Sequence, residues 1–130
     1  MAAEKNFENR IKKYIDKNNG WYVKFFANAY TKSGIPDILC CLNGRFLGIE
    51  VKQENGKPSE LQEFHLREIN KIKGLGILAY PSGFDELKEI IDMVSEDGKI
   101  DLSHKLNEKG YIECKRRWIN DWRTTKFGYW

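Results

Sequence analysis

A two-residue turn constrains this chain more than any other feature of its sequence. Asn43 and Gly44 stand between two apolar runs, Ile38–Leu42 and Arg45–Val51. Asn-Gly is favoured in a type I′ turn because both central residues of that turn need a positive φ angle. The sequence therefore predicts a tight β-hairpin. Because both arms are apolar on both faces, we expect the hairpin to be buried in a sheet covered by helices.

The same turn predicts which residues face each other across the hairpin. With a two-residue loop, Ile38 lies opposite Ile49, and Asp37 lies opposite Glu50. Directly opposed residues have Cβ atoms about 4.5–5.5 Å apart. Two carboxylates so close in an apolar sheet need a shared proton, a cation or a basic side chain to compensate them. Lys52 follows Glu50 by two residues, so strand alternation places it on the same face.

Apolar periodicity predicts the remaining elements. They are a helix over Glu4–Asn18, a strand over Trp21–Ala27, a helix over Ser59–Lys73, a strand over Leu75–Tyr80, a helix over Pro81–Val94, a short helix near Leu102–Glu108 and a strand near Tyr111–Lys115. A strand–helix–strand unit from Arg45 to Tyr80 forms a right-handed crossover, which requires parallel outer strands. We therefore expect an α/β fold with a central mixed sheet flanked by helices.

A chain of 130 residues fits one domain. We divide it into a core over residues 1–95 and a basic, aromatic extension over residues 96–130, packed on the same domain. No apolar run approaches the ~18 residues of a membrane span, and the N-terminus lacks the apolar stretch of a signal peptide. We expect a protein that works inside the cell, without a membrane partner.

Basic residues gather at the C-terminus. From Cys114 to Trp130 there are five basic residues against one acid, whereas the whole chain has a net charge of only +3. Arg116 and Arg117 stand in a run that also contains Trp118 and Trp122, and such a mixture suits nucleic-acid binding. Packing of these aromatic rings against the core or a second subunit is an equally good interpretation. The three cysteines and two widely spaced histidines do not predict a structural zinc site.

The acid pair and its lysine are the equipment of a magnesium-dependent phosphodiester nuclease. Mg²⁺ prefers oxygen ligands and usually takes one or two carboxylates together with water and phosphate oxygens. Lys52 would orient the attacking water or stabilise the transition state. The alternative is an exposed hairpin end, with Asp37 after a proline and Glu50 paired to Lys52 at the surface.

These residues resemble a known family. Ile35-Pro36-Asp37, followed thirteen residues later by Glu50-Val51-Lys52, resembles the signature of the PD-(D/E)xK nucleases. The wider pattern resembles the VRR-NUC domains, the virus-type replication–repair nucleases, over about Phe7 to Ile91. It is carried by the segments Lys32–Asp37, Asn43–Arg45, Gly48–Lys52, Asn55–Gln62 and Leu78–Ser82.

The resemblance implies a restriction-endonuclease-like core and hydrolysis of DNA to 5′-phosphate and 3′-hydroxyl ends. It implies that Asp37, Glu50 and the backbone carbonyl of Val51 bind Mg²⁺ or Mn²⁺, with no small-molecule cofactor. Lys52 matches the motif lysine, and Gln62 matches a glutamine of this branch. Small stand-alone members from phages and bacteria are homodimers that cut branched DNA such as Holliday junctions. The implied setting is the cytoplasm of a bacterial cell, with the gene carried by a phage or prophage.

Glu8 and Gln62 each have a second interpretation. Glu8 matches a first-helix glutamate that helps to bind the metal through water, although Glu4 competes for this role. Either acid also suits the first turn of a helix, where the helix dipole favours it. Gln62 lies three residues after Ser59, and this capping-box spacing alone would explain it.

Three further residues are candidates for contact with DNA phosphates. Lys24 lies in the first expected strand, and Lys32 and Ser33 lie in the loop before Gly34. The alternative for Lys24 is a stem that extends along a half-buried strand, with the charged end in solvent. We expect His65 to be structural.

Three other functions remain open. The chain could be a nuclease specific for flaps, single strands or ends, working as a monomer. It could also be a DNA-binding module without catalysis, or a protein-interaction domain that uses its tryptophan-rich end.

Overall fold

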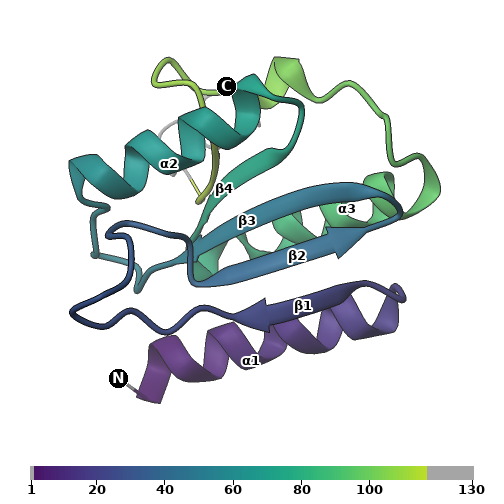
Figure 1. Ribbon diagram of the computed structural model, residues 1–130. Helices are drawn as coiled ribbons and strands as arrows, with labels where there is room; N and C mark the ends of the chain where they lie inside the picture. Colours follow the sequence, from purple (N-terminus) through teal and green to yellow (C-terminus); the bar gives the residue numbers. More distant parts are fainter. Residues whose placement is uncertain (1, 117–130) are drawn as a thin grey trace, which may run out of the picture.

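The computed structural model describes residues 2–116, which form three α-helices and a five-stranded sheet (Figure 1). The elements in chain order are α1 (Ala2–Lys17), β1 (Trp21–Lys24), β2 (Ile38–Leu42), β3 (Arg45–Val51), α2 (Glu60–Lys71), β4 (Leu75–Ala79), α3 (Phe84–Glu96) and β5 (Ile112–Cys114). Short 3₁₀ turns occupy Pro81–Gly83 and Ser103–Lys105. Among these residues no helix is both long and apolar enough to cross a membrane.

The sheet has the strand order β1-β2-β3-β4-β5 and is mixed. β1, β2 and β3 are antiparallel neighbours, whereas β3, β4 and β5 run parallel. Asn43 and Gly44 have φ angles of 50° and 80°, and Ile38 pairs with Ile49. The predicted turn, the register of the hairpin from Ile38–Ile49 to Leu42–Arg45 and the parallel pairing across α2 are thus confirmed.

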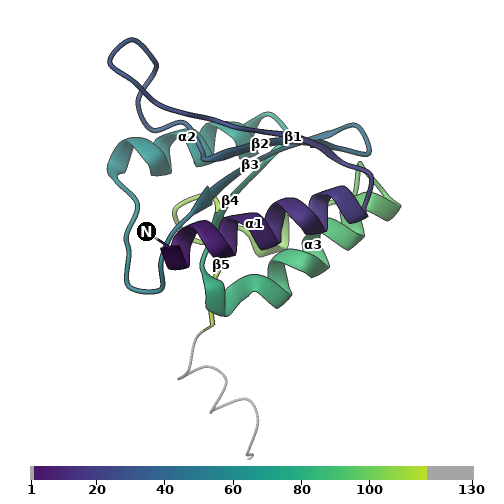
Figure 2. The same ribbon diagram turned by 90° about the horizontal axis from the view of Figure 1, so that it is seen from below.

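Helices lie on both faces of the sheet. Figure 2 shows α1 and α3 side by side on one face and α2 on the other. The main core lies between the sheet and the helices α1 and α3, and it includes Phe7, Ile11 and Leu87. On the opposite face, Leu66 of α2 packs with Leu78 and two tyrosines in a smaller cluster.

The expectation that helices cover both faces of the hairpin is wrong for one part of it. α2 lies over β3 and β4, so no helix within residues 2–116 covers the α2-side face of β1 and β2. Trp21, Cys41 and Phe46 are cross-strand neighbours there, and all three are exposed. A helix about 10 Å wide covers only about two strands spaced about 4.8 Å apart. One helix therefore cannot cover the α2-side face of all five strands.

The remaining differences concern the ends of elements. β1 stops at Lys24, so the following residues to Pro36 belong to a long loop, and a 3₁₀ turn precedes α3. The sheet extends past the expected boundary at residue 95, because β5 pairs with β4. Residues 117–130 of the expected extension lie outside the described residues.

Close contact between α2 and β4 depends on a glycine. A Cβ atom at Gly76 would lie 2.2 Å from the carbonyl oxygen of Leu66, so no other residue fits without a shift. The Asn70 side chain also donates hydrogen bonds to the carbonyls of both residues, at 3.0 and 3.1 Å. These contacts fix α2 on the sheet, and the start of α2 carries part of the candidate site.

Candidate functional site

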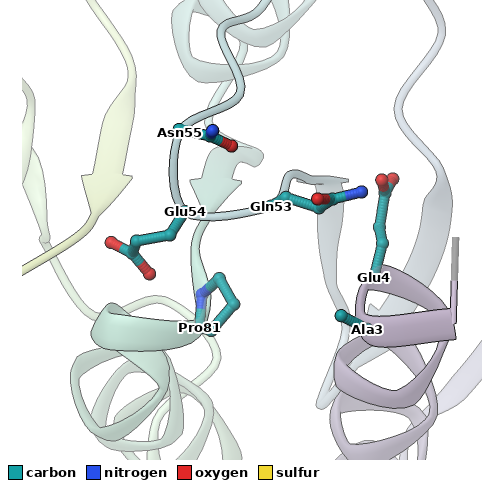
Figure 3. A pocket seen from close by; sticks show the side chains of 6 residues that line it. All are labelled: Ala3, Glu4, Gln53, Glu54, Asn55 and Pro81. Atoms are coloured by element: carbon teal, nitrogen blue, oxygen red, sulfur yellow. The ribbon is translucent and has the colours of Figure 1, made fainter.

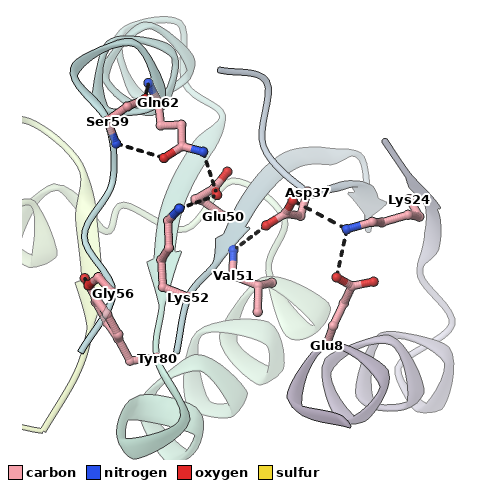
Figure 4. Close-up of polar contacts among 10 residues, drawn as sticks. All are labelled: Glu8, Lys24, Asp37, Glu50, Val51, Lys52, Gly56, Ser59, Gln62 and Tyr80. Atoms are coloured by element: carbon pink, nitrogen blue, oxygen red, sulfur yellow. Dashed lines mark hydrogen bonds and ion pairs between the residues drawn. The ribbon is translucent and has the colours of Figure 1, made fainter. Parts of the chain in front are cut away.

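One end of the hairpin gathers the predicted acids and lysines (Figure 4). Lys24 is the last residue of β1, Asp37 directly precedes β2, and Glu50 is the next-to-last residue of β3. The backbone N–H of Phe25 donates to the carbonyl of Asp37 at 2.8 Å, which ties β1 to the start of β2. Pairing of the three strands therefore brings these side chains together from distant parts of the sequence.

Asp37 is held by one backbone and one side-chain donor. Its Oδ2 atom accepts the N–H of Val51 at 2.9 Å, and Oδ1 lies 3.4 Å from the ammonium nitrogen of Lys24. The side chain is 25% exposed, so solvent reaches it. Beyond Ile38, the Asp37 carboxylate thus accepts the Val51 N–H in place of a backbone carbonyl of the neighbouring strand, and its second oxygen faces the Lys24 ammonium.

Glu50 is the most deeply buried acid of the site, with a side chain only 3% exposed. Its Oε2 atom accepts from Gln62 at 3.1 Å and lies 3.5 Å from the Lys52 ammonium. Its Oε1 atom is buried and has no hydrogen-bond partner among residues 2–116. Burial, reinforced by the negative charge of Asp37 and opposed by Lys52, raises the pKa of Glu50 to about 8.

Gln62 combines the two roles that the sequence left open. Its side-chain Oε1 accepts the N–H of Ser59 at 2.9 Å, and its backbone N–H donates to the Ser59 hydroxyl at 3.1 Å. These two bonds complete a capping box at the start of α2. The amide nitrogen that remains donates to Glu50. Capping therefore fixes the side chain in the orientation that holds the buried acid.

Glu8 contacts the site through a lysine. Lys24 donates to Glu8 at 2.8 Å, and Lys12 lies 2.9 Å from the other carboxylate oxygen. Burial would raise the pKa of Glu8, but the hydrogen bonds and charges of Lys24 and Lys12 outweigh it and lower the pKa. Burial would likewise lower the pKa of Lys24, but Glu8 and Asp37 raise it. The Lys24 ammonium thus lies between Glu8 and Asp37.

The competing acid Glu4 belongs to a separate opening. It lines a cleft of about 520 Å³ between the start of α1, the Gln53–Asn55 segment and Pro81 (Figure 3). In this view Glu4 and Gln53 flank the same gap. Since Gln53 directly follows Lys52, the cleft adjoins the candidate site along the chain.

Two residues that the sequence analysis missed hold the loop after Lys52. The carboxylate of Glu54 accepts from the backbone N–H of Ser82 at 2.9 Å and from its hydroxyl. The Tyr80 hydroxyl donates to the carbonyl of Gly56 at 2.9 Å. An acid in a loop and a tyrosine at a strand end carry no spacing signal, so sequence reasoning had no means of pairing them.

The other predicted DNA contacts are spread more widely. Lys32 and Ser33 are exposed in the loop between β1 and β2, where the Ser33 carbonyl lies 3.0 Å from Nε2 of His65. Arg116 follows β5, two strands beyond β3, and its backbone N–H donates to Ser82. Arg117 lies outside the described residues. The structure brings Lys24 together with the acids but not Arg116.

The loop over residues 25–36 also presents aromatic side chains that the sequence analysis did not single out. Phe26 is 75% exposed and Tyr30 is 97% exposed. An Asn28 side chain accepts the N–H of Tyr30 at 2.8 Å and shapes the turn. The loop contains no acid, it begins after Lys24 and ends before Asp37, and it projects from the sheet (Figure 2).

The geometry fits a hard divalent cation held by few protein ligands. Within residues 2–116 there is no group of three histidine, cysteine or acidic side chains close enough to hold a metal. The two carboxylates of Asp37 and Glu50 match the one or two that Mg²⁺ usually takes. The partnerless Oε1 atom of Glu50 is an oxygen that a cation would satisfy.

Comparison of the chain with protein-family models, with curated proteins and with solved structures finds no match in any of the three.

Proposed function

We propose that this protein is a metal-dependent nuclease that hydrolyses DNA phosphodiester bonds. The observation that carries the proposal is the acid pair at the hairpin end, in which a buried oxygen of Glu50, beside Asp37 and Lys52, has no hydrogen-bond partner within residues 2–116. A carboxylate in such a place is costly to the fold, and acids perturbed in this way cluster at functional sites. The order of the motif residues, together with an α/β fold, supports a VRR-NUC domain with a restriction-endonuclease-like core.

Asp37 and Glu50 would hold the Mg²⁺ or Mn²⁺ ion through Oδ1 and Oε1, with the backbone carbonyl of Val51 as a further ligand. Two carboxylates, a carbonyl and water give the oxygen-rich shell that both ions prefer. When bound, the ion lowers the pKa of a water molecule and neutralises charge that develops on the phosphate. Glu8 is 7% exposed and is reached from Asp37 through Lys24, so its part is indirect.

The remaining residues orient and balance these ligands. Gln62 holds Glu50 by one hydrogen bond while its own side chain is fixed by the capping box. Lys52 places a cation 3.5 Å from Glu50 with 21% of its side chain exposed, so it can reach a phosphate or a water at the mouth of the site. A preorganised cation at this place stabilises the transition state without reorganisation during the reaction.

Branched DNA is the substrate class that the loop between β1 and β2 favours. Exposed aromatic rings stack on unpaired bases, and Phe26 and Tyr30 lie on a loop whose two ends are site residues. Lys32 and Ser33, on the same loop, would contact phosphates. The resemblance to small VRR-NUC proteins, rather than the substrate, supports the cytoplasm of a bacterial cell as the setting, with the gene carried by the host, a phage or a prophage.

A homodimer would bring two sites to the paired strands of a junction. The uncovered row formed by Trp21, Cys41 and Phe46 supports a second copy of the chain as its partner, because an exposed apolar sheet face favours association.

Cleavage of a labelled panel of DNA structures tests the proposal. The panel contains a four-way junction, a flap, a single strand and a linear duplex, each incubated with Mg²⁺, Mn²⁺ or chelator. We expect paired symmetric cuts in the junction that chelator abolishes, and a loss of about 100-fold or more in Lys52→Ala. Lys71→Ala is the matched control, because Lys71 is 68% exposed and its ion pair is with Glu68 at the surface.

Each other outcome points elsewhere. Metal-dependent cutting of flaps or single strands by a monomer would support the proposed nuclease activity and contradict the proposed specificity for junctions. Binding of DNA without cleavage, equal in the wild-type protein and Lys52→Ala, would indicate a non-catalytic module. Absence of any salt-sensitive DNA binding would favour a protein-interaction domain.

A further inference from the structure

Lys24 has an unusual position for a residue expected to contact DNA. Its ammonium nitrogen turns inward, 2.8 Å from Glu8 and 3.4 Å from Asp37, and its side chain is only 23% exposed (Figure 4). It also lies 5.8 Å from the centre of the Phe26 ring. The side chain therefore lies within the site, between the first helix and the hairpin.

The oxygen that faces Lys24 is the one a metal ion would need. Oδ2 of Asp37 is engaged by the backbone N–H of Val51 at 2.9 Å, so Oδ1 is the atom turned toward a cation. A monovalent ammonium group beside Oδ1 competes with a divalent ion for the same negative charge. Two cations at one carboxylate also repel each other, more strongly in a partly buried site than in water.

The two distances indicate which contact of Lys24 is the firmer. At 2.8 Å the bond to Glu8 has the length of a charge-assisted hydrogen bond, whereas 3.4 Å to Asp37 is long. Lysine carries its charge on a flexible stem. The ammonium can therefore leave Asp37 while it stays bound to Glu8.

We propose that Lys24 is the resident counter-cation of the metal-free site, and that a divalent cation binding at Asp37 and Glu50 displaces its ammonium group from Asp37. This inference rests on the proposed metal-dependent function. Glu8 then acts as a positioning residue, which retains the displaced lysine at the site, rather than as a direct ligand. In the metal-free site the positive charge of Lys24 reduces the repulsion between the acids and so stabilises the fold. The same charge lowers the affinity of the site for a metal ion.

Metal binding by the full chain, without DNA, tests this role. Mn²⁺ affinity is measured by the loss of the free-ion signal in electron paramagnetic resonance and by calorimetry. We expect Lys24→Met to bind Mn²⁺ about tenfold more tightly than the wild-type protein, which corresponds to about 1.4 kcal/mol. The same variant should show a lower Tm in chelator and a larger rise in Tm with Mn²⁺.

Lys12→Met is the matched control. Lys12 also pairs with Glu8, at 2.9 Å, but it has no contact with Asp37. Its removal should change Mn²⁺ affinity by less than about threefold. The Lys12–Glu8 pair is separated from Asp37 by Lys24, and solvent screens the charge of a partly exposed pair. Equal or weaker Mn²⁺ binding by Lys24→Met, with an intact fold by circular dichroism, would overturn the proposal for Lys24 alone.

A second measurement uses the wild-type protein and does not depend on the stability of the variant. In ¹⁵N spectra of the lysine ammonium groups, Mg²⁺ should shift the signal of Lys24 much more than that of Lys12. An unchanged Lys24 signal at saturating Mg²⁺ would contradict the displacement. If the wild-type protein and Lys24→Met both fail to bind Mn²⁺, or Asp37→Asn binds as well as they do, the proposed metal site itself is wrong.

Discussion

Replacing Glu50 by glutamine should stabilise the metal-free protein, although it removes a proposed catalytic residue. Burial and the charge of Asp37 raise the pKa of Glu50 from 4.5 to about 8 in the folded state. The folded protein therefore holds a proton that the unfolded chain releases above pH 4.5. Between these two pKa values the free energy of unfolding falls as the pH rises, by about 1.4 kcal/mol per pH unit.

The size of the effect follows from this interval. At pH 7.5 the accumulated loss is about 4 kcal/mol by the same relation. Glutamine has nearly the same shape, can still accept the Gln62 hydrogen bond, and carries no charge to bury. We expect Glu50→Gln to be about 2–4 kcal/mol more stable than the wild-type protein at pH 7.5 in chelator, where domains of this kind total about 5–15 kcal/mol. At pH 4.5 the two proteins should differ little.

Urea denaturation between pH 4.5 and 8, followed by circular dichroism in chelator, measures this difference. Glu89→Gln is a suitable control, because Glu89 is exposed in the middle of α3 and its replacement should alter stability by less than about 0.5 kcal/mol at any pH. Saturating Mn²⁺ should reverse the order, since only the wild-type carboxylate gains a cation. Parallel pH profiles of the wild-type protein and Glu50→Gln would refute the reasoning.

Two further predictions concern the scaffold. Burial raises the pKa of the Cys40 thiol to about 12 and also raises that of Cys114, whereas Cys41 is exposed. A thiol reagent should therefore modify Cys41 first and the other two cysteines only on unfolding, which mass spectrometry measures. Gly76→Ala should lower the free energy of unfolding by about 3 kcal/mol in urea denaturation, because its Cβ would collide with the Leu66 carbonyl of α2; an unchanged midpoint would show that α2 shifts freely.

Local signals predicted the central part of the fold well. Asn43 and Gly44 specify their own turn, and that turn fixes the register of β2 on β3 without knowledge of the rest of the chain. The parallel pairing of β3 and β4 follows from the connection through α2. The approach of Asp37 and Glu50 could be predicted for the same reason, because the same hairpin positions both residues.

What failed depended on the dimensions of neighbouring elements. Apolar residues at Cys41 and Phe46 indicated a covered face, but whether a helix lies there depends on how many strands one helix can span. The anchoring of the loop by Glu54 and Tyr80 was equally unpredictable, since it joins residues from separate segments. The direction of the Lys24 side chain belongs to the same class, because both of its acids come from other elements.

The sequence left three ways to compensate the opposed acids: a proton, a basic side chain or a cation. The structure divides the first two between the carboxylates. Asp37 is balanced by a backbone N–H and by Lys24, whereas Glu50 has its pKa raised into the neutral range and has Lys52 beside it. The two lysine contacts are long, at 3.4 and 3.5 Å, and one oxygen of Glu50 has no hydrogen-bond partner among residues 2–116. Under the proposed function, this pair would be compensated well enough to fold and would still gain free energy from a divalent cation, which is the combination that a reversible metal site requires.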